Sequence, residues 1–330
     1  MEGIEVNAAK QPWIHSAPFD SLFLLAPPLL TTLVVALCSR FFETRVVSLG
    51  WWIALVLCVD VAHVYASIYR SYLHPKAFLL RRQLFLAVPL ACWAGGVMLY
   101  SVRASFFWTA LAYLAVFHFV RQQYGFLRLY SRNQKTSLLD QSVIYLATLY
   151  PLGFWHAHLP RNFHWFLEGD FLTGFPVWLA SFLGWALMAT ILAYLFQEIR
   201  AWRTEGYINI PKQMVVSGTV LSWYCGIVWL NGDLSFTFTN VLAHGIPYLA
   251  LVWSVGSREQ AQMHRSSKKK MRNFSPFRFL YTCRAIPLYL GILLFLAYLE
   301  EGLWGGMIWR ERLDIFGEAL EAEEIGRAHV

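Results

Sequence analysis

The sequence has 330 residues, of which 57% are hydrophobic and 14% are charged, with a mean hydropathy of +0.45. Soluble domains carry about 25% charged residues, so this composition excludes a soluble globular protein and predicts an integral membrane protein. The formal net charge of +7 comes without a soluble basic domain. We therefore attribute it to membrane topology and contact with membrane lipids, and we expect no nucleic-acid partner.

Nine continuous apolar runs follow one another along the chain, each close to the roughly 20 residues that carry a helix across a bilayer. They cover residues 21–38, 46–69, 84–100, 104–124, 138–154, 175–195, 214–230, 236–255 and 280–299. Because the runs are continuous and do not alternate, they favour helices over strands. We predict an all-α fold, a single polytopic transmembrane bundle of about nine helices that occupies residues 1–324.

Lys and Arg are distributed unevenly between the two sides of this bundle. If the first residue is cytoplasmic, 20 of the 27 Lys and Arg residues fall on the cytoplasmic side, as the positive-inside rule requires. Eight of them lie in residues 258–284, including the run RSSKKKMR at 265–272. We predict a multi-pass protein of a bacterial-type inner or plasma membrane with a cytoplasmic N-terminus, with residues 258–278 cytoplasmic and residues 156–164 outside.

The last six residues, IGRAHV at 325–330, match the translation of a common short-read sequencing adapter. We expect this tail to be non-native and the natural chain to continue after Glu324.

The second run contains CVDVAHVYASIYRSYLHP, whose polar residues a helix would place in one sector. They are Asp60, His63, Ser67, Arg70 and His74. We predict that Asp60, His63 and Ser67 face the bundle interior, while Leu57 and Val64 face other helices or lipid. Ionisable groups inside a membrane are costly and usually functional, so this stripe indicates a site.

The fourth run closes on AVFHFVRQQYGF, in which His118, Arg121 and Gln122 lie about one turn apart on one helix face. These polar residues interrupt an otherwise apolar run, which again indicates a site. An ion pair between Arg121 and Asp60 is an alternative that would make Asp60 structural.

The eighth run contains FTFTNVLAHGIPYLALVW, with Asn240, His244 and Tyr248 at intervals of four residues. Pro247 has no N–H group and leaves the carbonyl of Ala243 unbonded. Interrupted helices occur in membranes where they line a buried or wet cavity.

The second, fourth and eighth runs cross the membrane in the same direction, so the depths of their histidines can be compared. Counted from the basic residues that follow them, these depths differ by up to about 16 Å. A shared site therefore requires Arg121 to lie inside the membrane or the eighth helix to bend at Gly245 and Pro247, and we expect both.

We predict that His63, His118 and His244 hold one metal ion, with Asp60 as a further ligand or as the acceptor that orients a histidine. Neutral imidazole suits iron, zinc or copper, and mixed histidine and carboxylate ligation favours non-haem iron. The histidine nitrogens should then lie within about 7 Å of one another. The alternative is three separate histidines that hydrogen-bond between helices, each contributing about 0.6 kcal/mol.

Three further histidines lie in HAHLPRNFH, between the fifth and sixth runs: His156, His158 and His164. An HxH pair can bind a metal, but this one borders Trp155 and Trp165. Aromatic residues of this kind are typical of the membrane interface, so we interpret the segment as interfacial.

The motifs VDVAH, FHFVRQ and LAHGIP resemble those of the Brp/Blh type of membrane carotene dioxygenase, in which single histidines on several helices hold a non-haem iron. The resemblance implies that His63, His118 and His244 are the iron ligands. The chain departs from the pattern of that family in three ways. It lacks an HGALD-like run and an HxxxH pair, and its acidic residue has a different position in the order of the motif residues.

From these patterns we expect a membrane-embedded, metal-dependent oxygenase or desaturase that acts on a lipid or isoprenoid, a hydrophobic small molecule entering from the bilayer. Iron on the three histidines would activate dioxygen, and Asp60 would tune the site. Arg121 and Gln122 would position a polar headgroup or stabilise an anionic oxygen intermediate. Three alternatives remain: a haem b electron carrier, a proton-coupled transporter that uses Asp60, His63 and His118, and a lipid-binding protein without chemistry.

Overall fold

The computed structural model describes residues 11–43, 46–134, 137–160, 169–263, 276–309 and 313–316. In these residues the chain is helical and contains no β-strand, which confirms the predicted all-α class. The predictions for His164, for the basic run at 265–272 and for the tail at 325–330 concern residues outside this described part.

Each of the nine predicted apolar runs overlaps a helix, and seven of the described helices are long and apolar enough to cross a membrane. These seven are Ala17–Leu37, Leu49–Arg70, Arg82–Val102, Ala104–Tyr130, Val177–Glu205, Asp233–Gln262 and Cys283–Gly306. The fifth and seventh runs correspond to α9 (Leu138–Ala157) and to α11 (Ile210–Trp223) continued by η4 (Tyr224–Trp229).

Several spans join α-helical and π-helical segments. The first consists of α1 (Ala17–Phe19), η2 (Asp20–Leu25) and α2 (Ala26–Leu37), and the second of α4 (Leu49–Trp51), η3 (Trp52–Val61) and α5 (Ala62–Arg70). The eighth consists of α12 (Asp233–Phe236), η5 (Thr237–Val241) and α13 (Leu242–Met263). The last consists of the 3₁₀-helical η8 (Cys283–Ala285), α14 (Ile286–Glu301) and the π-helical η9 (Gly302–Trp309). The short elements are α3 (Ser39–Phe42), α6 (Pro75–Leu80), η7 (Pro276–Tyr281) and α15 (Leu313–Phe316).

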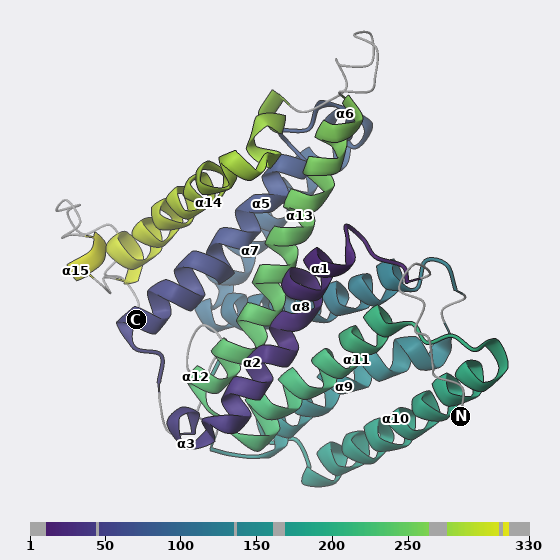
Figure 1. The fold of residues 1–330 in the computed structure, drawn as a ribbon. Coiled ribbons are helices and arrows are strands. Elements are labelled where there is room, and N and C mark those ends of the chain that lie inside the picture. Colours follow the sequence, from purple (N-terminus) through teal and green to yellow (C-terminus); the bar gives the residue numbers. More distant parts are fainter. Residues whose placement is uncertain are drawn as a thin grey trace.

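The helices pack in two groups joined by α2 and α13 (Figure 1). In one group α9 packs against α10 (Val177–Glu205) and α11; in the other, α5 packs against α14. Helix α13 contacts both α2 and α5, while α8 (Ala104–Tyr130) contacts α7 (Arg82–Val102), α9 and α11. Helix α13, which carries His244, thus lies between the two groups and beside α5, which carries His63.

Local sequence signals set several helix ends. Ser137 and Asp140 form a reciprocal capping box at the start of α9. Gly206 ends α10 in the left-handed conformation with φ 64°, which a glycine adopts without strain. Asn209 then caps α11 by accepting from the backbone N–H of Lys212.

Contacts at both ends of the second and eighth spans show that these spans run in the same direction. Arg70 lies 2.8 Å from Glu259, near the ends of α5 and α13. At the opposite end, the backbone N–H of Val47 donates to Asp233 over 2.9 Å. The predicted relative direction is therefore confirmed, and the assignment of one side to the cytoplasm stays a prediction.

Candidate metal centre

The three candidate histidines occupy distinct helical settings. His63 is the second residue of α5, directly after the π-helical η3, and His244 is the third residue of α13, directly after η5. His118 lies inside the α-helical α8. Short π-helical segments are rare and occur frequently at functional sites. The wide turns before His63 and His244 were not predicted from the sequence.

The three histidines converge. One nitrogen from each of His63, His118 and His244 lies within 4.8 Å of the other two. The Nε2 atoms of His63 and His244 are 3.0 Å apart. The ring centroids of His63 and His118 lie 6.4 Å apart, and those of His118 and His244 lie 5.0 Å apart. The predicted convergence within 7 Å is confirmed. The contact between His63 and His244 also fits the alternative of histidines that hydrogen-bond between helices.

Burial differs sharply within this cluster. His63 is 4% exposed and His244 is 0% exposed, whereas His118 is exposed on the surface of the bundle. Leu114 and Phe117, also on α8, are 62% and 57% exposed. Two histidines of the cluster therefore lie in the helix core, and the third lies at a surface where apolar side chains are exposed.

The polar stripe of the second span is largely placed as predicted. His63 faces the interior, Val64 is 55% exposed, and Leu57 is buried against other helices. Ser67 is half-buried, and its hydroxyl donates to the carbonyl of Val64.

His63 is oriented by its own helix. Its Nδ1 lies 3.2 Å from the carbonyl oxygen of Val59 and 3.8 Å from a carboxylate oxygen of Asp60. A carbonyl only accepts hydrogen bonds, so Nδ1 carries the proton and Nε2 has its lone pair directed at His244. Asp60 lies beside the nitrogen that points away from the cluster. This position matches the orienting role predicted for Asp60 and does not match that of a fourth ligand.

His244 is held by stacking. Its ring lies parallel to that of Phe119, with centroids 3.8 Å apart. Its Nδ1 is buried without a hydrogen-bond partner in the described residues, and so is Oδ1 of Asn240, one helical turn earlier. Tyr248, one turn later, faces the ring of His63 edge-on at 5.8 Å.

Gln122 and Arg121 bond to groups other than the histidine side chains. The Gln122 side-chain amide donates to the carbonyl of His244 over 2.7 Å, which joins α8 to α13. The sequence predicted an unbonded carbonyl at Ala243, and the carbonyl that Gln122 binds is the next one. The guanidinium of Arg121 donates to the hydroxyl of Tyr145 on α9 over 2.8 Å, so the suggested pair with Asp60 does not form.

The difference in depth that the sequence suggested is resolved by helix length. Helix α8 continues to Tyr130, nine residues beyond Arg121, and α13 continues to Met263. Arg121 therefore lies inside a helical span, as the shared site required. Both helices continue beyond the basic residues from which the depths of the histidines were counted. The count therefore overestimated the difference in depth between the histidines.

A close helix approach, also not predicted, brings His244 to His63. A Cβ atom on Gly245 would lie 2.5 Å from the side chain of Val59 and 3.1 Å from its backbone oxygen. Only glycine lets α13 approach η3 so closely. The same Val59 oxygen orients His63. The contact between Gly245 and Val59 is therefore directly linked to the orientation of His63 in the cluster.

Each histidine of the HxH pair has a hydrogen-bond partner in the helix that precedes it. Nδ1 of His156 bonds to the carbonyl of Leu152, and its Nε2 bonds to the hydroxyl of Tyr113. Nδ1 of His158 bonds to the carbonyl of Phe154, whose ring stacks on it with centroids 4.1 Å apart. Each histidine thus bonds to its own helix.

Comparisons with protein-family models, with curated proteins and with solved structures find no match to this chain. The resemblance to membrane carotene dioxygenases therefore stays a prediction that rests on three short motifs.

Proposed function

We propose that the chain is a membrane-embedded, metal-dependent enzyme in which His63, His118 and His244 hold one metal ion. The observation that carries the proposal is the approach of one nitrogen from each histidine to within 4.8 Å. Two imidazole ligands of one ion, with bonds of about 2.0 to 2.2 Å, lie roughly 3 to 4 Å apart. The 3.0 Å separation of two Nε2 atoms lies at the short end of this range.

The number of ligands favours a reactive ion over a structural one. Three protein ligands leave positions free for substrate or water, as catalytic sites require. Neutral imidazoles suit iron, zinc or copper, and the resemblance of the histidine motifs leads us to name non-haem iron. Bound iron would supply oxidative chemistry with dioxygen, so we propose an oxygenase or desaturase.

The exposure of His118 supports a substrate that enters from the bilayer. The histidine opens onto a surface that includes Leu114 and Phe117, where only an apolar molecule is favourably accommodated. We therefore propose a lipid or isoprenoid substrate. Asp60 would keep His63 in its ligating tautomer, as carboxylates near metal-bound histidines do. Gln122 would hold α8 against α13. Arg121 would lie about one helical turn from the exposed His118.

The geometry favours a small ion over haem b. Two histidines on opposite faces of a haem place their nitrogens about 4 Å apart with the porphyrin between them. The Nε2 atoms of His63 and His244 are 3.0 Å apart with the rings in contact, a shorter separation that supports a small ion.

A proton-coupled transporter is the second candidate, because Asp60, His63 and His244 form a chain of ionisable groups with steps of 3.8 and 3.0 Å. Such a chain could pass a proton. The chain of groups ends at Nδ1 of His244, which has no hydrogen-bond partner in the described residues. Because no described group there would pass the proton on, we favour the metal site over a proton path. Proton flux in proteoliposomes tests the transporter directly.

Metal content tests the main proposal. The full chain, reconstituted in nanodiscs, is loaded with Fe(II), Zn(II) or Cu(II), desalted and measured by mass spectrometry of the elements. We expect about one ion per chain, and loss of most of it in His63→Ala, His118→Ala and His244→Ala. His158→Ala is the matched control and should keep the metal. A wild-type chain that holds none of the three metals, or three variants that bind as the control does, would refute the site.

A further inference from the structure

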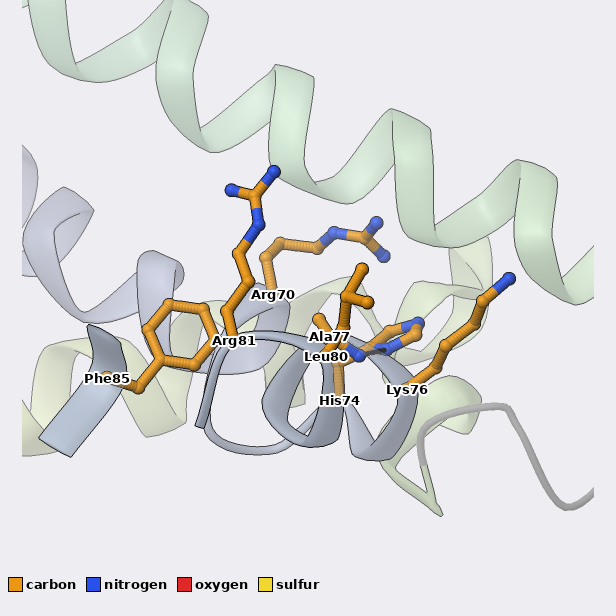
Figure 2. A pocket seen from close by; sticks show the side chains of 7 residues that line it. All are labelled: Arg70, His74, Lys76, Ala77, Leu80, Arg81 and Phe85. Atoms are coloured by element: carbon orange, nitrogen blue, oxygen red, sulfur yellow. Dashed lines mark hydrogen bonds between the residues drawn. The ribbon is translucent and has the colours of Figure 1, made fainter. Parts of the chain in front are cut away.

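A pocket rich in basic residues lies at the end of the second span, away from the histidine cluster. It has a volume of about 270 Å³ and is lined by Arg70, His74, Lys76, Ala77, Leu80, Arg81 and Phe85. These residues come from the end of α5, the short helix α6 and the start of α7. We call it the basic pocket. Figure 2 shows the cationic groups of Arg70, Lys76 and Arg81 on the same side of α6.

Part of the positive charge in the basic pocket is already compensated. Arg70 donates two hydrogen bonds to Glu259, of 2.8 and 2.9 Å. Nδ1 of His74 accepts from the backbone of Ala77, so its Nε2 donates to the same carboxylate over 3.2 Å. Glu259 therefore holds Arg70 and His74 in place at one wall of the pocket.

Arg81 and Lys76 supply the charge that is left. Both side chains are exposed, and neither forms an ion pair within the described part of the chain. Together with Arg70 and Glu259 they give the pocket a net positive charge. Arginine is suited to phosphate because its planar group donates two parallel hydrogen bonds.

The position of the pocket favours a lipid over a free anion. Arg70 is the last residue of one apolar span and Arg82 the first of the next, so the pocket lies where a helix end meets the membrane surface. Its apolar wall contains Leu80, which is 76% exposed, and Phe85. A phosphate at the arginines would leave an attached acyl chain against these two side chains.

We propose that the basic pocket binds the phosphate headgroup of an anionic phospholipid. This inference concerns a second site and does not depend on a metal at the histidines. Basic residues near a membrane surface each contribute about 1 kcal/mol to the binding of anionic lipids, which corresponds to about a fivefold change in affinity.

Lipid binding to the full chain in detergent, followed by native mass spectrometry, tests the proposal. The lipids are phosphatidic acid and phosphatidylcholine with identical acyl chains, and glycerol 3-phosphate serves as a soluble competitor. The variants are Arg81→Ala and Lys76→Ala, both at exposed positions where folding should be unaffected. The matched control is Arg82→Ala, a neighbouring exposed arginine that does not line the pocket.

We expect phosphatidic acid to bind at least fivefold more tightly than phosphatidylcholine. Arg81→Ala and Lys76→Ala should each weaken its binding about fivefold, and Arg82→Ala should leave it unchanged. Equal binding of the two lipids would overturn the proposal, and so would equal losses in Arg81→Ala and Arg82→Ala. Competition by glycerol 3-phosphate at concentrations similar to those of the lipid would show a site for free phosphate and overturn the assignment to a lipid.

Discussion

The Nε2 atom of His244 lies 3.0 Å from the Nε2 atom of His63, a residue 181 positions earlier in the chain. Because Nδ1 of His63 donates to the carbonyl of Val59, the lone pair of its Nε2 points at His244. Nε2 of His63 either accepts a hydrogen bond from Nε2 of His244 or binds an ion together with it. In both cases the contact depends on how closely α13 approaches η3, and that distance can be changed without touching a histidine.

Replacement of Gly245 by alanine tests this dependence. The new methyl group would lie 2.5 Å from the Val59 side chain and 3.1 Å from its backbone oxygen, so the two helices must separate. We expect destabilisation by about 1 to 3 kcal/mol and at least tenfold weaker metal binding, measured by thermal unfolding and metal titration. Gly291→Ala is the control, because nothing lies within 4 Å of the corresponding Cβ. If Gly245→Ala bound metal as tightly as the control, metal binding would not depend on the contact between Gly245 and Val59.

A bound ion should stabilise the fold. A ligand that binds only the folded chain stabilises it by about 2.7 kcal/mol at a concentration 100 times its dissociation constant. We expect added metal to raise the unfolding temperature of the wild type and of His158→Ala, and to leave that of His118→Ala unchanged. His118 is exposed, so its replacement should not itself unfold the protein. Equal shifts in all three proteins would place the bound metal elsewhere.

Tyr113 should matter for stability and not for metal binding. Its hydroxyl bonds to Nε2 of the buried His156 and accepts from the backbone N–H of Leu172 over 3.3 Å. Tyr113→Phe removes both bonds and should cost about 1 to 3 kcal/mol. Tyr100→Phe, at an exposed position, is the control and should have little effect. If metal content fell in Tyr113→Phe alone, His156 would belong to a metal site after all.

Lys212 joins α9, α10 and α11 at one end of the bundle. Its ammonium group lies 2.8 Å from Asp140 and 2.6 Å from Glu198, and Lys212 is 5% exposed. Lys212→Met would leave the buried Asp140 and the half-buried Glu198 without their cation, at a cost of about 3 to 5 kcal/mol. The triple variant with Asp140→Asn and Glu198→Gln should recover part of this loss. A single variant with unchanged unfolding temperature would show that the carboxylates are solvated.

The predicted orientation can be checked with native cysteines. Cys38 follows the first span and Cys283 begins the last, and both are exposed. With a cytoplasmic N-terminus, a membrane-impermeant maleimide applied to intact cells should label Cys38, and Cys283 only after permeabilisation. Cys38→Ser and Cys283→Ser identify the labelled residue. The reverse order of labelling would invert the topology.

The sequence predicted the helical class and the histidine cluster because both depend on signals that are strong in a membrane. A continuous apolar run has few ways to fold, and an imidazole within one requires a partner, so His63, His118 and His244 were expected to meet. The roles of Arg121 and Gln122 were harder to predict. Their partners, Tyr145 and the carbonyl of His244, depend on which helices are neighbours, and spacing along one helix does not reveal that.

The basic pocket was not predicted for a related reason. In the sequence Arg70 belongs to a polar stripe on one helix, and no pattern connects it with Lys76 and Arg81. Their common position depends on the short helix α6, whose start is set by the His74 cap and Pro75. The approach of Gly245 to Val59 was also invisible, because a single glycine in an apolar run fits many helix contacts.

The π-helical segments before His63 and His244 place a constraint on the length of the chain. Each residue of an α-helix turns the chain by about 100°. Deleting one residue from η3 without a change in its helical winding would therefore turn His63 by roughly that angle relative to Leu55, which is buried in the core of the same span. The same holds for η5 and His244. Residues in these two segments can then be exchanged more freely than they can be inserted or removed, and related chains that keep the cluster should keep the number of residues in both segments.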